Sequence, residues 1–199
     1  VSYGLVGYPV LQTADIIFCK ANWVPVGIDQ APHIELSREI VRRFNNHYGN
    51  IFPEPQIKLT NSPSIVGTDG LAKMSKSLDN HIELAQNEHE TGLRIRTMVT
   101  DTQRIRKTDP GRPNVCNVFS LHKLFNPKDV DRIFHQCTNA EIGCVEDKDY
   151  LAMGINNYLA EFRERREEFS RKPSYVTEVL FDGAQKAKKI AKATLAEVY

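Results

Sequence analysis

The sequence contains little cysteine, no excess of either charge and no long apolar run. Its 199 residues include only four cysteines, too few for a disulfide scaffold in a chain of this length. With 26 basic and 25 acidic residues, composition alone indicates neither a nucleic-acid binder nor a membrane-surface protein. The apolar runs are far shorter than a bilayer span, and the first residues lack the features of a secretion signal. We therefore expect a globular protein in the cytoplasm that does not contact a membrane.

The first part of the chain alternates strand-like and helical stretches. Residues 22–27 form a short β-branched run that ends in glycine, and residues 33–44 place apolar side chains on one helical stripe. Pro32 fits only the first turn of that helix. The order strand, tight turn, helix predicts an α/β fold here.

The later part of the chain has an almost entirely helical pattern. Asn87 followed by Glu90 has the spacing of a capping box, and Asn126-Pro127 is typical of another helix start. Further helices are expected over residues 147–171 and from residue 174 to the end. The length allows two small domains, and we place them at residues 1–85 and 86–199.

A possible pocket wall lies in residues 8–19, which read "YPVLQTADIIFC". Pro9 suits the first turn of a helix, and Tyr8, Gln12, Asp15 and Cys19 then share one face. Asp15 is the only charged residue in this stretch. Two interpretations stay open: a half-exposed helix whose carboxylate meets water, or a pocket in which a desolvated carboxylate accepts a hydrogen bond from a ligand.

A tight turn, Gly27-Ile28-Asp29-Gln30, follows the predicted strand and opens the predicted helix. Open α/β sheets bind ligands at such ends, because backbone amides and the helix dipole converge there. An ordinary helix-start turn is the alternative.

The densest basic and hydroxyl cluster is Lys73-Met74-Ser75-Lys76-Ser77, which follows Asp69-Gly70. Two lysines after a glycine-bearing loop can neutralise a polyphosphate, while serine hydroxyls and backbone amides add hydrogen bonds. A solvated lysine and serine loop is the alternative interpretation.

The Lys73–Ser77 stretch, KMSKS, resembles the second signature of class I aminoacyl-tRNA synthetases. The rest of the chain resembles the tryptophanyl-tRNA synthetase family, in the order and spacing of "YPVLQTADI", "VPVGIDQAPHIELSREIVRRFN" and "MVTDTQRIRKTDPG". This resemblance implies the second half of a Rossmann-type catalytic domain in residues 1–85, followed by an all-helical anticodon-binding domain in residues 86–199. It also implies ATP-dependent activation of tryptophan and its transfer to tRNA(Trp), with Mg²⁺ accompanying ATP.

The resemblance assigns residues to both substrates. Asp15 is placed opposite the indole N–H, a donor that phenylalanine lacks. The other substrate-binding positions that it implies are Tyr8, Gln12, Val24, Val26 and Gln30. The implied ATP-binding positions are Gly27, Ile28, Asp29 and Ile65, together with Lys73, Met74, Ser75, Lys76 and Ser77 of the phosphate loop. Lys73, Ser75 and Lys76 are implied to be catalytic, and no protein metal ligand is expected.

Two positions depart from the family pattern. The family often has methionine in place of Gln12 and glutamate in place of Ile28. Because a glutamine at the indole pocket is also found in tyrosyl-tRNA synthetases, tyrosine is the alternative substrate. A non-catalytic nucleotide-binding or tRNA-binding fragment or paralogue is a further alternative.

The family's first signature, an H-x-G-H motif in a strand-to-helix turn, is not matched by any of the six histidines. We therefore expect this sequence to be the carboxy-terminal portion of a longer enzyme, inactive in tryptophan activation by itself. The family resemblance also implies a homodimer.

Some members of the family hold a four-iron cluster with four cysteines. Here Cys116, Cys137 and Cys144 match three of those positions, but Asp147 stands at the fourth. A carboxylate is a poor replacement for a thiolate on such a cluster, so we expect unbridged thiols and no stable cluster.

Basic residues crowd one segment of the second part, residues 94–112. Its members either contact tRNA phosphates or pair with neighbouring carboxylates such as Asp101 and Asp109. They are Arg94, Arg96, Arg104, Arg106, Lys107 and Arg112.

Overall fold

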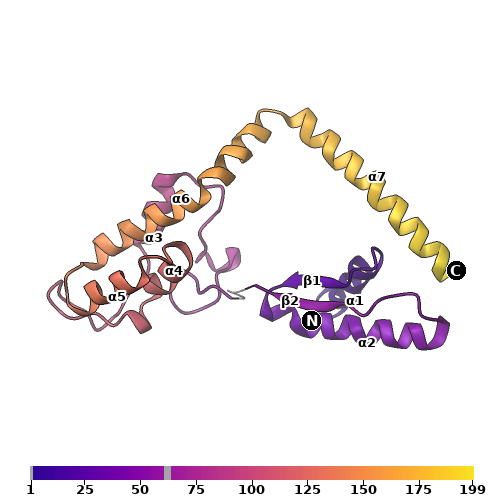
Figure 1. The fold of residues 1–199 in the computed structure, drawn as a ribbon, viewed down its shortest axis with the longest axis horizontal. Helices are drawn as coiled ribbons and strands as arrows, with labels where there is room; N and C mark the ends of the chain where they lie inside the picture. Colours follow the sequence, from indigo (N-terminus) through magenta and orange to yellow (C-terminus); the bar gives the residue numbers. More distant parts are fainter. Residues whose placement is uncertain (1, 61–63) are drawn as a thin grey trace. The chain divides into compact units, whose positions relative to one another are not determined.

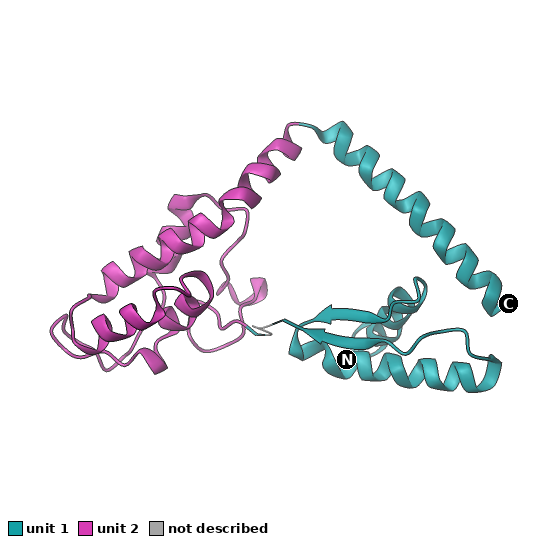
Figure 2. Cartoon of the chain, in the orientation of Figure 1, with its two compact units in different colours: residues 1–64, 172–199 teal, residues 65–171 magenta. Residues whose placement is uncertain are grey.

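The computed structural model describes residues 2–60 and 64–199. The chain divides into two compact units: unit 1 comprises residues 1–64 and 172–199, and unit 2 comprises residues 65–171 (Figure 2). Within the described residues, no helix is long and apolar enough to cross a membrane.

Unit 1 is built around a βαβ arrangement (Figure 1). The strands β1 (Trp23–Val26) and β2 (Gln56–Leu59) pair in parallel along their whole length. Helix α2 (Ala31–Tyr48) connects them, as parallel pairing requires a crossover segment. This arrangement confirms the predicted α/β character of the first part of the chain.

The sequence explains where α2 begins and ends. Pro32 lies in its first turn, as expected, and Gly49 ends it with a φ of 108°, a conformation that favours glycine. The residues buried along the helix are Ile34, Ser37 and Val41, which recur at helical spacing on one stripe.

Helix α1 (Tyr3–Ile17) packs against α2. Its buried Thr13 hydroxyl lies 2.8 Å from the hydroxyl of Ser37. The prediction that Pro9 occupies the first turn is wrong, because the helix begins at Tyr3 and Pro9 lies inside it. Proline removes one intrahelical hydrogen bond, and packing against α2 outweighs that loss. Cys19 lies beyond the end of α1 and so does not continue its predicted face.

The last helix, α7 (Pro173–Val198), also belongs to unit 1. Its buried Thr194 hydroxyl donates to the Phe18 carbonyl at 2.7 Å. Lys20 forms an ion pair with Glu197 at 2.6 Å. These contacts attach the end of α7 to the segment that follows α1.

Unit 2 is helical and has a continuous hydrophobic core. Its helices are α3 (Glu88–Arg96), α4 (Asn117–Phe125), α5 (Val130–Thr138) and α6 (Cys144–Ser170). The largest side chains in the core are almost completely buried, as packed interiors require. The core residues are Ile95, Met98, Cys116, Val118, Phe119, Leu121, Ile133, Leu151, Ala152, Ile155 and Leu159.

The predicted helix starts are matched closely at α3 and less closely at α5. Asn87 and Glu90 form a complete capping box, because each side chain accepts the backbone N–H of the other residue. The predicted start at Asn126-Pro127 is early: these residues lead into a turn, and α5 begins at Val130.

The two compact units follow packing and do not coincide with the predicted domain boundary between residues 85 and 86. The segment from Ile65 onward belongs to unit 2, since Ile65 and Ile82 pack against its core. The assignment of residues 1–85 to a Rossmann half and of residues 86–199 to an anticodon-binding domain stays a prediction.

Candidate active site

The first group of predicted site residues forms a polar cluster in unit 1, named here the Tyr8–His33 cluster. It consists of Tyr8 and Gln12 on α1, Gln30, and His33 on α2. The Tyr8 hydroxyl lies 2.8 Å from His33 Nε2, and Gln30 Oε1 lies 3.0 Å from His33 Nδ1. Gln12 Nε2 donates to Gln30 Oε1 at 3.4 Å. His33 therefore joins Tyr8 to Gln30, and Gln30 joins Gln12 to the cluster.

His33 was not among the predicted site residues. Its ring meets the Tyr8 ring edge to face, with centroids 4.9 Å apart. A sequence signal did exist, because His33 follows Gln30 by one helical turn and so shares its face.

The predicted turn at residues 27–30 leaves the carboxyl end of β1 directly. The Gln30 N–H donates to the Gly27 carbonyl at 3.0 Å, which closes a short 3-10 turn, η1 (Ile28–Gln30). The Gln30 side chain also donates to Asp29 at 3.1 Å. Gln30 thus links the turn to the Tyr8–His33 cluster at the end of a parallel strand where α/β proteins bind ligands.

Three further predicted substrate-binding residues line α1 and β1. Asp15 follows Gln12 on α1 by one turn and is exposed, which matches the water-facing interpretation for this chain by itself. Val24 and Val26 point to the same side of β1, and both are half-buried. Their contacts with tryptophan stay a prediction.

The second group of predicted site residues is the Lys73–Ser77 loop in unit 2. An antiparallel bridge joins Val66 to Lys73, and the Met74 N–H donates to the Ile65 carbonyl at 2.8 Å. Residues 65–74 therefore form a short hairpin whose second arm begins the loop, and the loop continues into the 3-10 turn η2 (Lys76–Leu78). The second arm and this turn are together named here the KMSKS hairpin. Lys73 and Lys76 are exposed, and the hydroxyls of Ser75 and Ser77 lie 2.8 Å apart.

Two polar residues that the sequence analysis did not select hold this loop. Asn80 is 2% exposed, and its Oδ1 accepts the Ser75 N–H at 2.7 Å. Its Nδ2 donates to Asp69 Oδ2 at 2.9 Å. Asp69 Oδ1 in turn accepts the Leu71 N–H at 3.1 Å, and these hydrogen bonds, that of Leu71 first, lower the pKa of Asp69.

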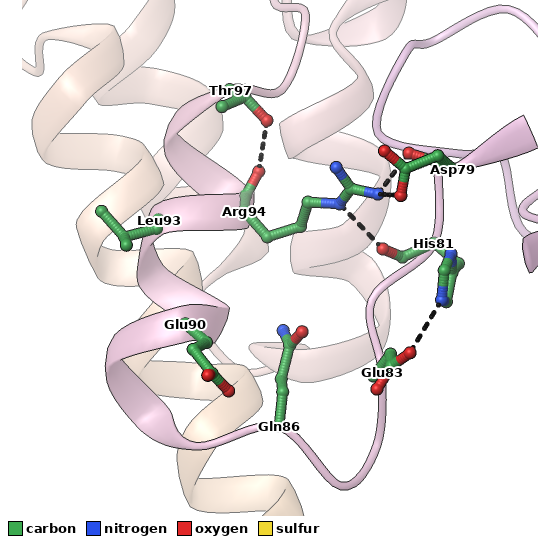
Figure 3. A pocket seen from close by; sticks show the side chains of 8 residues that line it. All are labelled: Asp79, His81, Glu83, Gln86, Glu90, Leu93, Arg94 and Thr97. Atoms are coloured by element: carbon green, nitrogen blue, oxygen red, sulfur yellow. Dashed lines mark hydrogen bonds and ion pairs between the residues drawn. The ribbon is translucent and has the colours of Figure 1, made fainter.

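The segment beyond the loop is attached to α3 by Arg94 (Figure 3). Arg94 Nε donates to the His81 carbonyl at 3.0 Å, and Arg94 Nη2 pairs with Asp79 Oδ1 at 2.6 Å. Beside them lies an open cavity of about 500 Å³ that Glu83 and Glu90 also line. Arg94 therefore attaches residues 79–81 to α3 in this chain.

The three cysteines of the candidate cluster site are free thiols, and two of them lie next to a guanidinium group. Arg104 Nη1 lies 3.7 Å from the Sγ of Cys137 and 3.9 Å from that of Cys144. Burial raises the pKa of Cys116, and it raises that of Cys137 to about 11. Thiols, rather than metal-binding thiolates, are therefore favoured at these two positions.

The fourth position of that site holds a buried carboxylate beside a buried imidazole. Asp147 Oδ1 lies 3.1 Å from Nε2 of the fully buried His122, but the two atoms do not have the geometry of a hydrogen bond. Across the described ranges, no group of three or more histidine, cysteine or acidic side chains is placed to hold a metal ion. A guanidinium against two sulfurs, and a carboxylate in place of the fourth thiolate, do not fit a four-iron cluster.

Some residues of the basic segment pair with carboxylates, and others are exposed and available for phosphate contact. Arg112 pairs with buried Asp101 at 2.9 Å, and Arg96 pairs with Asp149 at 2.9 Å. The Arg112 guanidinium is the main cause that lowers the pKa of Asp101 to about 2. Arg106 and Lys107 are exposed beside a cavity of about 570 Å³. Pairing with carboxylates is thus confirmed for Arg112, and phosphate contact stays a prediction for the exposed pair.

Comparison with known proteins identifies the family of this chain. Residues 1–160 match the family model described as tRNA synthetases class I (W and Y). The chain therefore belongs to this family of class I tRNA synthetases.

Two relatives and one solved structure that this chain resembles are named for tryptophan. The tryptophan–tRNA ligase of Aquifex aeolicus is 48% identical over 199 residues, which covers 99% of this chain and 50% of the relative. That of Thermotoga maritima is 44% identical and covers 98% of this chain and 60% of the relative. The crystal structure of Campylobacter jejuni tryptophanyl-tRNA synthetase, complexed with ADP and tryptophan, superposes with a TM-score of 0.81 at 37% identity. The superposition covers 100% of this chain and 62% of the Campylobacter jejuni chain. The chain thus spans about half to three fifths of the length of these relatives.

Proposed function

We propose that this chain supplies part of an enzyme that activates tryptophan with ATP and transfers the tryptophanyl group to tRNA(Trp). The observation that carries the proposal is the KMSKS hairpin, in which Lys73 and Lys76 are exposed on a loop fixed by its own hydrogen bonds. The tryptophan–tRNA ligase names of its relatives support this choice within the family.

The hairpin is proposed to act on the phosphates of ATP. In adenylate formation the tryptophan carboxylate attacks the α-phosphorus and pyrophosphate leaves, so the protein need not supply a nucleophile. Lys73 and Lys76 neutralise the charge that shifts toward the leaving pyrophosphate, while Ser75 and Ser77 add hydroxyl donors. Mg²⁺ bound to ATP would supply further neutralisation. Met74, between the two lysines, is the remaining residue of the loop that we propose to bind ATP.

The nucleotide side of the site is proposed to include the turn after β1. Gly27 allows close approach of the backbone, and Ile28 and Asp29 follow it at the start of η1. Ile65 is proposed to lie near adenine, although in this structure it also packs against the core of unit 2.

The tryptophan side of the site is proposed to lie at the Tyr8–His33 cluster and along the same face of α1. Tyr8 and Gln30 would bind the amino and carboxylate ends of the amino acid, and Val24 and Val26 would supply apolar wall. Asp15 would accept the indole N–H, an interaction that discriminates against amino acids without this donor.

The choice of tryptophan over tyrosine is supported by the tryptophan names of the relatives. Gln12 donates its Nε2 to Gln30 Oε1 at 3.4 Å, a contact within the chain that is compatible with either substrate. The proposal extends to tRNA(Trp) as the second substrate, to a homodimer and to a cytoplasmic setting, which the family resemblance implies.

The test uses a chimaera in which the part of the Thermotoga maritima relative that this chain does not match is joined to it in the relative's own order. ATP–pyrophosphate exchange is measured with tryptophan and, separately, with tyrosine, and charging is measured with tRNA(Trp). Exchange that depends on tryptophan and not on tyrosine is expected. Exchange with tyrosine alone would support the tyrosyl alternative. Binding of ATP or tRNA without exchange would support a non-catalytic module.

A further inference from the structure

We infer that Asn80 is the positioning residue of the phosphate loop: through Asp69 and the backbone it fixes the conformation in which Lys73, Ser75 and Lys76 are presented. The inference rests on the proposed function for the role of that loop. Its structural basis is independent of any activity.

The burial of Asn80 sets it apart from its surroundings. Asn80 is 2% exposed, whereas Lys76, Ser77 and Asp79 beside it are exposed. A buried side-chain amide is costly unless its donors and acceptor are satisfied. Here they are, because Oδ1 accepts the Ser75 N–H at 2.7 Å and Nδ2 reaches both Asp69 at 2.9 Å and the Lys73 carbonyl at 3.3 Å. One side chain therefore binds the backbone at two of the three proposed catalytic positions.

Asp69 extends this arrangement to the other side of the hairpin. Its Oδ1 accepts the N–H groups of Leu71 and Ala72 at 3.1 and 3.4 Å, and its Oδ2 accepts Asn80 Nδ2. The turn before the lysines and the segment after them are thus joined through one carboxylate and one amide. This chain of hydrogen bonds runs through the side chains of Asp69 and Asn80.

Gly67 and Arg94 determine the position of Asn80, the first through the space at its side chain and the second through the residues next to it. A Cβ at Gly67 would lie 2.2 Å from Asn80 Nδ2, so only glycine leaves room for the amide. Arg94 holds the flanking residues, through Asp79 Oδ1 and the His81 carbonyl (Figure 3). The hydrogen bonds of Arg94 therefore fix the residues on either side of Asn80, and Gly67 leaves room for its side chain.

The first test measures amide hydrogen exchange by NMR in the 199-residue chain. In Asn80→Ala, the Ser75 amide should exchange at least about tenfold faster, because its acceptor is lost, while core amides of Leu151 and Ile155 keep their rates. Gly67→Ala should have the same local effect, since it displaces the Asn80 side chain without removing a polar group. Asn157→Asp, an exposed change on α6, is the matched control. An unchanged Ser75 rate in both loop variants, with the core intact, would overturn the inference.

The second test measures tryptophan-dependent exchange in the chimaera. Asn80→Asp places two carboxylates together and should lower kcat at least about tenfold with little change in the KM for tryptophan. The double variant Asp69→Asn, Asn80→Asp reverses donor and acceptor between positions 69 and 80 but does not restore the donor to the Lys73 carbonyl, so it should recover part of the lost kcat. Equal kcat in wild type and Asn80→Asp, or no recovery in the double variant, would contradict a positioning role. A chimaera without any exchange would count against the proposed function alone, because the amide measurement decides the inference.

Discussion

Unit 1 and unit 2 differ in where they place large apolar side chains. Unit 2 has one continuous core, to which its four helices α3, α4, α5 and α6 and the segments between them contribute apolar side chains. Unit 1 leaves large apolar side chains exposed on its first helix and first strand, even though both elements are well formed. These residues are Tyr3, Leu5, Val6, Val10, Leu11 and Trp23.

This difference shows that the two groups of site residues depend on different interactions. In unit 1 the Tyr8–His33 cluster is held by the packing of α1 on α2, through Thr13 and Ser37. In unit 2 the KMSKS hairpin is an exposed loop on a packed helical body, held by Asn80 and Asp69. The stability of unit 2 therefore comes from burial, and the conformation of its loop comes from hydrogen bonds.

The largest expected effect comes from a cavity in the core of unit 2. Leu151→Ala in unit 2 should lower the free energy of unfolding by about 2–5 kcal/mol, because Leu151 is fully buried. The same change at Leu11 in unit 1, which is 66% exposed, should change it by less than about 0.5 kcal/mol. Urea denaturation of the 199-residue chain measures both. Similar losses for the two variants would contradict the contrast between the units.

The next effect concerns the loop of unit 2. In the chimaera, Lys76→Ala should lower the rate of tryptophan activation by about a hundredfold to a thousandfold and leave tryptophan affinity nearly unchanged, because charge moves to the leaving pyrophosphate only in the transition state. Lys128→Ala, a change at another exposed lysine of unit 2, is the control. An activation rate equal to that of the control would remove Lys76 from the site.

A smaller effect is expected on the unit 1 side of the site. Asp15→Ala in the chimaera should weaken tryptophan binding by about 1–3 kcal/mol, the usual scale for the loss of a buried hydrogen-bond partner. Asp15→Asn should have a milder effect if its amide oxygen faces the indole. Calorimetry with tryptophan measures both, and equal affinity across the three proteins would rule out this role.

The smallest effect is a pH dependence within unit 2. The pKa of Asp101 is lowered to about 2 by Arg112, below its unfolded value of about 4. Its contribution to stability is therefore present above pH of about 4 and is lost as the pH falls toward about 2. Because Arg112 is 47% exposed, we expect about 1 kcal/mol. Asp101→Asn should flatten this part of the stability curve in urea titrations, and an identical curve would contradict the assignment.

The sequence predicted the elements that have strong local signals. The β-branched run of β1, Pro32 in the first turn of α2 and the Asn87 capping box are each fixed by residues close in the chain. The start of α1 was missed because Pro9 has the pattern of a first turn, and only packing against α2 shows that the helix continues through it.

The candidate site was predicted in its motifs but not in its supporting residues. His33 and Asn80 belong to it through contacts across turns, and no residue pattern marks Asn80 as buried. The sequence analysis also did not show that the segment around the Lys73–Ser77 loop packs against unit 2. This packing depends on contacts of Ile65 and Ile82 with a core built from later residues.

The most direct test of the account is tryptophan-dependent ATP–pyrophosphate exchange, measured side by side on three proteins. They are the chimaera, the chimaera with Lys73→Ala and Lys76→Ala, and the 199-residue chain alone. We predict exchange by the chimaera, a loss of at least about a hundredfold in the double lysine variant and no exchange by the chain alone. Equal exchange with and without the two lysines would contradict the central claim that this hairpin acts on ATP.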